Sequence, residues 1–365
     1  MDADGDTSGD PMVRTKLHAP SLPSDLVSRK RLRVRLESGL ATPLTLVSAS
    51  AGYGKSILVS SWLEHLDKPN AWLSLEKDDD TPRRFLAYFL AAVAKVFPDA
   101  IPRTTTMLNH LDMPPIRELG SSLINELDRI DEDYILVLDD VHHLRHRSIF
   151  ELLDGLLQHP PAHLHLVLIG RRDPFLPISA MRAQSLITEI RTLDLRFTPE
   201  ETARFLSQEL DKEVSKSIAA SWAARTEGWC TGLRLAALTI NRLEDMQKLV
   251  DGMESDSLHS VSEFLIQEVL SIQPAATQKY LLKSSILNRF CAELLDELFE
   301  ADKQDPDGIT NGLSFLNWLD KSGMFSIPLD LENRWFRYHN LFRELLHNQL
   351  QKQQKADQIK RDHLT

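Results

Sequence analysis

The sequence has little cysteine, and this scarcity excludes two ways of stabilising a fold. Its 365 residues include only Cys230 and Cys291, too few for a disulfide framework or a four-cysteine zinc site. Long apolar runs are also missing, since none approaches the roughly 18 residues that a membrane-spanning helix needs. Residues 1–10 have neither the basic nor the apolar region of a signal peptide. We therefore expect a cytoplasmic protein without a membrane partner.

The chain has no excess of basic residues either. Its 42 Lys+Arg stand against 53 Asp+Glu, which gives a formal charge of -11 and argues against nucleic-acid binding as the main role of these residues. The hydrophobic share of 42% and the charged share of 26% are typical of globular proteins. The length predicts two or three domains. We find no repeat of about 30–50 residues that would indicate a solenoid.

The first half of the chain alternates short apolar segments with helical patterns. The clearest helical pattern is Pro82–Phe97, with Thr81 as its predicted N-cap and Pro98 as its stop. Strands that alternate with helices predict a mostly parallel sheet covered on both faces. The segments expected as strands are Leu44–Val47, Ala71–Leu75, Tyr134–Leu138, Leu164–Ile169 and Ile190–Leu195.

Helical patterns dominate after Phe197. Thr198-Pro199-Glu200-Glu201 predicts a capping box at a helix start. A hairpin is expected at Met324–Trp335, and loops are expected at Asp251–Ser257 and Ala301–Gly308. The expected helices are Glu201–Glu209, Lys216–Thr226, Gly232–Arg242, Val261–Ile272, Thr277–Leu287 and Leu341–Leu350.

A phosphate-binding pattern directly follows the first expected strand. Ala49–Ser56 reads ASAGYGKS, which fits the P-loop pattern except that Ala replaces the first Gly. Gly52 and Gly54 would let successive backbone N–H groups point into one anion-binding nest. Lys55 would bridge the β- and γ-phosphates, and Ser56 would place its hydroxyl on Mg²⁺. The alternative is an ordinary glycine-containing turn before a helix.

A second motif ends the expected strand Tyr134–Leu138. Asp139 and Asp140 follow it, at the edge where ligands bind in open α/β sheets. Asp139 would hold Mg²⁺ through water, and Asp140 would orient the attacking water. The alternative is an Asp-rich turn with no role in binding.

Two further features near these strands have competing interpretations. Arg171 and Arg172 follow the strand Leu164–Ile169, where an arginine could report the γ-phosphate or belong to a solvated basic turn. His142 and His146 stand four residues apart, as a pair of metal ligands can. No third ligand is evident, so we expect surface and loop roles for these histidines.

Several of these features together resemble the STAND class of signal-transducing P-loop ATPases, in particular the MalT-like, ATP-dependent regulators of the LuxR type. Thr15-Lys16-Leu17 and Leu26-Val27-Ser28-Arg29 are similar to the adenine-side motif of the family, with Ser28 where Gly is usual. The resemblance implies that Val27 packs on or bonds the base and that Arg29 approaches the nucleotide. It also matches Arg171 to the sensor arginine of the family.

The resemblance extends into the second half of the chain. Glu227–Ala236 is similar to a segment of the small helical domain of the family, with Cys230 where Pro is common. Tyr338–Leu346 resembles the winged-helix motif whose histidine, here His339, contacts the β-phosphate of ADP. Together with the motifs above, this implies Lys55, Asp139, Asp140 and Arg171 as catalytic residues, and it implies nucleotide contacts from Val27, Arg29, Ala51, Gly52, Tyr53, Gly54, Lys55, Ser56, Ile57 and His339.

The expected fold is an α/β P-loop NTPase domain with an AAA-like parallel sheet, followed by a small helical domain and a winged-helix domain. The boundaries are a disordered tail at 1–13, the nucleotide-binding domain at 14–196, the helical domain at 197–255, the winged-helix domain at 256–350, and the start of a linker or next domain at 351–365.

The function implied by the resemblance is an ATP/ADP-dependent switch of a transcriptional regulator. Its resting state would be closed and bound to ADP, while ATP would drive opening and self-association, with slow hydrolysis resetting it. An effector and DNA would bind through regions outside this sequence. The alternatives are a turnover P-loop ATPase, such as a remodeller or kinase, and a STAND switch with a non-transcriptional output. Direct DNA binding by these residues is a third alternative.

Overall fold

The computed structural model describes residues 12–234, 237, 270–271, 273–299, 311–322, 326–330, 334–338 and 340–362. Most of the expected tail, both expected loops, most of the helices Gly232–Arg242 and Val261–Ile272, and His339 therefore lie outside the described residues. The chain divides into two compact units. The first holds the described residues of Met1–Leu22, Lys30–Ser48 and Lys55–Arg191, and the second holds those of Pro23–Arg29, Ala49–Gly54 and Thr192–Thr365.

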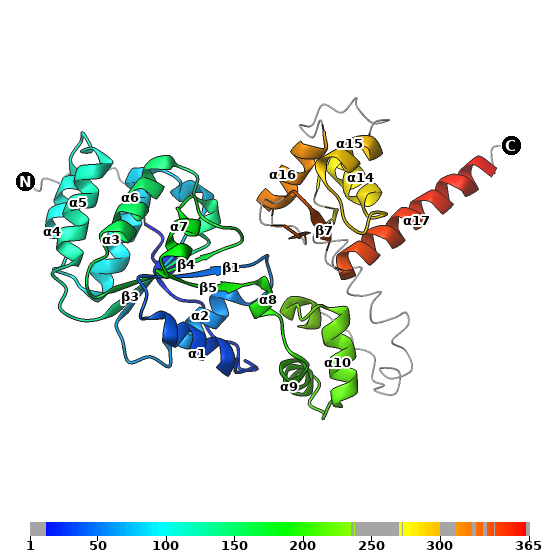
Figure 1. The fold of residues 1–365 in the computed structure, drawn as a ribbon, viewed down its shortest axis with the longest axis horizontal. Helices are drawn as coiled ribbons and strands as arrows, with labels where there is room; N and C mark the ends of the chain where they lie inside the picture. The colour runs from blue at the N-terminus through cyan, green and yellow to red at the C-terminus, as the bar shows by residue number, and fades with distance from the viewer. Residues whose placement is uncertain are drawn as a thin grey trace, which may run out of the picture. The chain divides into compact units, whose positions relative to one another are not determined.

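The first unit is built around a five-stranded sheet of order β2-β3-β4-β1-β5, in which all neighbouring strands are parallel (Figure 1). This confirms the predicted parallel α/β domain. Strand β4 lies between β1 and β3, so the segments that follow these three strands meet at one edge. The strands are β1 (Leu44–Ser48), β2 (Asn70–Ser74), β3 (Tyr134–Asp139), β4 (Leu164–Gly170) and β5 (Ile187–Arg191).

Helices cover both faces of this sheet, as buried strands of a parallel sheet require. Alternate strand residues such as Leu46 and Leu138 pack in a core with residues of α3, α5 and α6. On the other face, the ring of Trp62 from α2 meets that of His165 from β4 at 6.5 Å. The elements of this unit include η1 (Arg14–Leu17), α1 (Lys30–Gly39), α2 (Lys55–Leu63), η2 (Lys77–Asp79), α3 (Pro82–Val96), α4 (Pro102–Asn109), α5 (Ile116–Leu127), η3 (Val141–His143), α6 (Arg147–Gln158) and α7 (Ile178–Ala183).

Two local predictions need correction. The expected strand Ile190–Leu195 is wrong from Thr192 onward, because β5 ends at Arg191 and α8 (Thr192–Leu195) follows it. The register of β5 is set by its pairing with β1, in which Leu44 faces Ile187 and Ser48 faces Arg191. Thr81 does precede α3, but its side chain makes no capping hydrogen bond.

Helices make up most of the second unit. The predicted capping box is confirmed, since Glu201 N donates to the Thr198 hydroxyl at 3.1 Å and Thr198 N donates to the Glu201 carboxylate at 3.0 Å. The elements after α8 are α9 (Pro199–Glu209), α10 (Lys216–Arg225), α14 (Ala275–Ser284), α15 (Ala292–Phe299), α16 (Gly312–Ser322), β6 (Ser326–Pro328), β7 (Phe336–Tyr338) and α17 (Asn340–Asp362).

The hairpin of the second unit joins β6 and β7 in antiparallel pairing, with Ser326 opposite Tyr338. It lies slightly later than predicted, because β7 begins after Trp335. The Tyr338 hydroxyl, fully enclosed, lies 2.6 Å from the Ser284 hydroxyl of α14. Helix α17 runs without a break through position 350. The later part of the second unit thus combines helices with a two-stranded hairpin.

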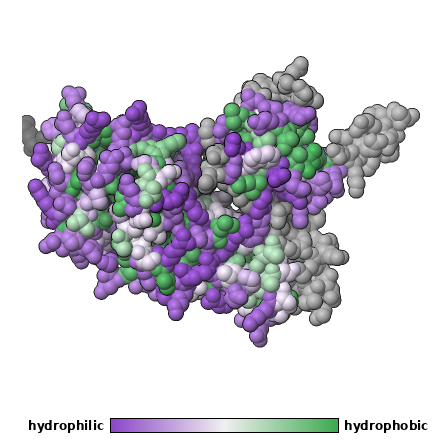
Figure 2. Space-filling model, in the orientation of Figure 1, coloured by the Kyte–Doolittle hydropathy of each residue, from purple (hydrophilic) through white to green (hydrophobic). Residues whose placement is uncertain are grey.

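The surface of the molecule is mixed in character. On the face shown in Figure 2, hydrophilic residues cover most of the first unit and hydrophobic residues form scattered patches. None of the described helices combines the length and the apolar character that crossing a membrane requires.

Candidate functional site

The loop between β1 and α2 has the backbone of an anion-binding turn. Gly52 and Gly54 have φ angles of 78° and 74°, in the left-handed region that favours glycine. Lys55 then begins α2. A Cβ added at Gly54 would meet nothing within 4 Å, so the loop is open beside this residue. These features fit a nest of N–H groups at a helix N-terminus.

Lys55 and Asp139 form a buried charged cluster in the first unit. Lys55 is 8% exposed and Asp139 is 5% exposed. Burial lowers the pKa of Lys55 to about 8, while the charges of Asp140 and Asp139 oppose this shift. Burial and the neighbouring charge of Asp140 raise the pKa of Asp139 to about 6, against a hydrogen bond from Ser56. Burial disfavours the charged form of Lys55, and a nearby anion favours it. This lysine is therefore suited to bind an incoming anion.

Ser56 and Asp139 also fit a magnesium ion. The Ser56 side chain hydrogen-bonds the Asp139 carboxylate, so a hydroxyl and a carboxylate oxygen already face one another. Hard oxygen donors of this kind, few in number, are what Mg²⁺ uses when substrate phosphates and water complete its octahedron. These two residues would hold the ion, as the sequence predicts.

Asp140 and Arg171 complete the group that the first unit brings together. Asp140 follows β3 with φ at 58°, and its backbone N–H donates to Asp139 Oδ1 at 2.9 Å. Its side chain is 44% exposed. Arg171 follows β4 and is exposed, and its charge adds to the lowering of the Lys55 pKa. Lys55, Ser56, Asp139, Asp140 and Arg171 therefore share one edge of the sheet.

His142 also belongs to this edge, and for this residue the expected surface role is wrong. Its side chain is only 7% exposed, because η3 folds back under the end of β4. Gly170 permits this packing: a Cβ there would lie 3.1 Å from Val141 Cγ2. Burial, with the charges of His143, Arg171, Lys55 and Arg172, lowers the pKa of His142 to about 3. His146 does have a loop role, since its ring accepts from Ser148 N at 3.3 Å and caps α6.

The remaining loop residues have their contacts in the second unit. The Trp229 indole N–H donates to Ala51 O at 3.2 Å. Thr231 donates to Gly52 O twice, from its backbone N–H and from its hydroxyl, each at 3.1 Å. Two carbonyl groups of the loop are thus held by the segment after α10. Sequence reasoning did not assign these contacts, because they join residues almost 180 positions apart.

Tyr53 is enclosed beside a charged cluster of the same unit. Its side chain is 3% exposed, and burial raises its pKa to about 12. The charges that act on it are those of Arg196, Glu227 and Arg337. This loop residue is therefore packed in the second unit.

Val27 and Arg29, the expected base-side residues, also belong to the second unit. Val27 is buried. Arg29 donates to Arg196 O at 2.9 Å and to the Glu201 carboxylate at 3.3 Å, and its guanidinium lies 4.7 Å from the centre of the Phe197 ring. Its described partners are therefore residues around the start of α9. Ile57 lies half-buried in the first turn of α2, and His339 lies outside the described residues.

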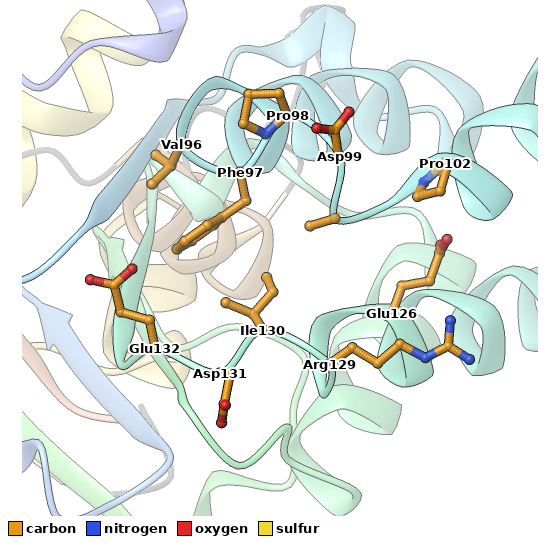
Figure 3. Close-up of a pocket in the computed structure, with 11 residues that line it drawn as sticks. Val96, Phe97, Pro98, Asp99, Pro102, Glu126, Arg129, Ile130, Asp131 and Glu132 are labelled. Carbon is orange, nitrogen blue, oxygen red and sulfur yellow. The ribbon is translucent and has the colours of Figure 1, made fainter.

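A separate hollow of about 620 Å³ lies beside the residues that precede β3 (Figure 3). Phe97 and Ile130 line it together with Glu126, Arg129 and Asp131. The Glu126 carboxylate already accepts N–H bonds from Arg103 and Thr104, at 2.8 and 2.9 Å. This hollow lies at the amino-terminal edge of β3, opposite Asp139, so it is not part of the phosphate site.

Comparison with known proteins supports the same architecture. Residues 266–358 match the MalT winged helix domain family. The fold is similar to that of a Walker-type ATPase of Pyrococcus abyssi, with a TM-score of 0.57 and 15% identity, covering 90% of this chain and 98% of that chain. The chain therefore has a P-loop ATPase fold with a MalT winged helix domain towards its C-terminus.

Two relatives are similar over almost the whole chain. The HTH-type transcriptional regulator MalT of Vibrio cholerae is 29% identical over 93% of this chain and 37% of its own length. The serine/threonine-protein kinase PknK of Mycobacterium tuberculosis is 30% identical over 94% of this chain and 30% of its own length. The chain thus spans about a third of the length of these homologues.

Proposed function

We propose that this chain is the ATP/ADP-dependent switch module of a transcriptional regulator. The observation that supports it is the gathering of Lys55, Ser56, Asp139 and Asp140 at one edge of the sheet, with Lys55 buried and suited to an anionic ligand. An adenine nucleotide would place its phosphates over Gly52–Ser56, with Lys55 at the β- and γ-phosphates.

The side chains divide the chemistry of hydrolysis between them. Mg²⁺, held by Ser56 and by Asp139 through water, would supply positive charge to the phosphates. Asp140 orients the attacking water, and Arg171 stabilises charge on the γ-phosphate. Turnover is slow, because hydrolysis resets a switch rather than serving a metabolic demand.

The switch itself requires different contacts with ADP and ATP. ADP holds a closed resting state through a bond from His339 to the β-phosphate, and ATP favours an open state that associates with further copies of the chain. Changing the ratio of open to closed states from 1:99 to 99:1 needs about 5.5 kcal/mol of differential binding. A few charge-assisted hydrogen bonds to phosphate supply energy of that size.

The output of the switch lies outside these residues. DNA and an effector would bind other regions of the full protein, as expected for a MalT-like regulator. The kinase relative favours a second candidate, in which the same kind of module controls a non-transcriptional output. The similar matches to a regulator over 93% of this chain and to a kinase over 94% of it support a module that carries the control rather than the output.

The test is to denature the purified protein and to identify the released nucleotide by chromatography. We expect near-stoichiometric ADP, and we expect Lys55→Ala to release none. His339→Ala should lose ADP and change the oligomeric state, whereas the matched variant His347→Ala on α17 should retain both. An empty site that takes up ATP and turns it over rapidly would overturn the switch and favour a turnover ATPase.

A further inference from the structure

His142 combines a little-exposed side chain with two ring nitrogens that make no hydrogen bond. Its side chain is 7% exposed, and neither Nδ1 nor Nε2 has a hydrogen-bond partner. Leaving a buried polar atom without a partner costs about 1–3 kcal/mol. Native proteins seldom retain such groups unless a ligand, water or function uses them. The position of this ring therefore calls for an explanation.

The surroundings of the ring connect two strand ends. Its Nδ1 lies 3.5 Å from Oδ1 of Asp140, just after β3. Its backbone carbonyl accepts from Arg172 Nη2 at 3.3 Å, just after β4. The ring of His143 packs against it, with centroids 4.2 Å apart. A neutral imidazole carries one N–H, and a carboxylate is an acceptor only, so the tautomer with Nδ1–H matches Asp140.

The distance of 3.5 Å between His142 Nδ1 and Asp140 Oδ1 is longer than that of a good hydrogen bond. Such contacts are often long in the ligand-free protein and shorten when substrate binds. The Asp140 side chain is 44% exposed, so a small movement towards His142 would meet little resistance. Asp139 differs, because Asp140 N and Ser56 already hold its carboxylate.

We infer that His142 is a positioning residue of the phosphate site: its Nδ1–H holds the Asp140 carboxylate in the orientation that aligns the attacking water. The inference rests on the proposed function, since it assigns how hydrolysis at that site is controlled. His142 acts on the reaction through Asp140.

The test compares His142→Phe with His142→Asn in the full chain. Phe keeps an aromatic ring, slightly larger than imidazole, without nitrogen, and Asn returns an N–H donor near the position of Nδ1. We expect single-turnover ATP hydrolysis to fall about 10- to 100-fold in His142→Phe, with the ATP dissociation constant changed by less than about threefold. His142→Asn should recover most of the rate. His143→Asn, the matched control on the neighbouring ring, should hydrolyse ATP like the unchanged protein.

Stability separates this role from a structural one. Phe removes the desolvation penalty of the two unpaired nitrogens, and its larger ring carries a packing cost that opposes this gain, so the thermal midpoint of His142→Phe should change little while its rate falls. A lowered midpoint with an unchanged rate would overturn the inference. So would an Asn variant as slow as the Phe variant.

The double variant His142→Phe/Asp140→Asn tests the route of the effect. If His142 acts through Asp140, the double variant hydrolyses ATP no more slowly than Asp140→Asn alone. If the rate reductions of the two single variants multiply in the double variant, the inference is overturned. Failure of the proposed function is distinguishable, because it shows in the unchanged protein, either as no ATP binding or as an empty site that turns ATP over rapidly. An unchanged protein that binds ATP without hydrolysing it overturns the positioning role alone.

Discussion

Glu227 and Arg337 form a bidentate ion pair within the second unit. Arg337 Nη1 donates to Glu227 Oε1 at 2.8 Å, and Nη2 donates to Oε2 at 2.6 Å. Arg196 donates to the same Oε2 at 2.7 Å. The Glu227 side chain is 7% exposed, so one buried carboxylate forms ion pairs with two guanidinium groups. The pair joins the turn after α10 to strand β7.

Removing the charge of Glu227 should destabilise the protein. Glu227→Gln keeps the shape but leaves two arginines without their counter-ion, so we expect the free energy of unfolding to fall by about 1–3 kcal/mol. Urea denaturation measures this change. The matched control is Glu151→Gln, which breaks an exposed pair with Arg147 and should cost less than about 0.5 kcal/mol. Equal losses in both variants would contradict the role of the buried pair.

The two loop glycines should respond differently to alanine. A Cβ at Gly52 would lie 2.6 Å from both Thr231 Oγ1 and Trp229 Nε1, whereas a Cβ at Gly54 would meet nothing within 4 Å. Both have positive φ, so backbone strain is similar in each and cancels in the comparison.

Without nucleotide, we therefore expect Gly52→Ala to lose about 1–3 kcal/mol more unfolding free energy than Gly54→Ala. Gly54→Ala should lose nucleotide affinity instead, because its methyl group enters the open space beside the loop. Denaturant titration and nucleotide binding measure the two effects. Normal ATP binding by Gly54→Ala would contradict this prediction and would indicate that the phosphates bind elsewhere.

The Asp25–Glu209 pair should make stability depend on pH. Burial and the hydrogen bond with Asp25 raise the pKa of Glu209 from its usual value of 4.5 to about 7. The folded state thus holds this proton more tightly than the unfolded state. The resulting stabilisation is complete below pH 4.5 and is lost as the pH rises through about 7.

Glu209→Gln should remove this part of the pH dependence. We expect its thermal midpoint to fall less than that of the unchanged protein between pH 5 and pH 8, since an amide does not titrate. Glu213→Gln, at an exposed position nearby, should keep the original slope. Identical slopes for the unchanged protein and Glu209→Gln would rule out Glu209 as the titrating group.

Magnesium should strengthen ATP binding through Asp139. We expect the dissociation constant of ATP to rise about tenfold when EDTA removes the metal. Asp139→Asn should abolish that difference, because the carboxylate that holds the ion is gone. Asp140→Asn should preserve it, since Asp140 is assigned to water. Fluorescent nucleotide titration with and without EDTA measures all three proteins, and a metal effect that survives in Asp139→Asn would contradict the assignment.

The sequence was sufficient to predict four of the five strands of the sheet and the position of the loop between β1 and α2. Buried parallel strands appear as uninterrupted apolar runs, as in Ile135–Leu138, and the loop pattern is local, so neither needed information from distant residues. Strand β5 was placed less well, because Glu189 and Arg191 break its apolar pattern and its register depends on pairing with β1.

Long-range packing could not be predicted in this way. Helices α15 and α16 were not expected, and the burial of His142 depends on how η3 meets the end of β4. The Glu227–Arg337 pair joins residues 110 positions apart. Such contacts follow from tertiary geometry, and no local pattern around either residue indicates them.

The position of β1 in the sheet has a consequence for synthesis on the ribosome. Its two neighbours are β4 and β5. Leu44 can therefore pair only after Leu166 and Ile187 have been synthesised, about 120 and 140 positions later. At 5–20 residues per second, that interval lasts roughly 6–30 s. During this time the strand that carries the phosphate loop has unsatisfied backbone on both sides, and nucleotide has no formed site to bind. Nascent chains that stop before Gly170 should therefore remain clients of chaperones, whatever the nucleotide concentration in the cell.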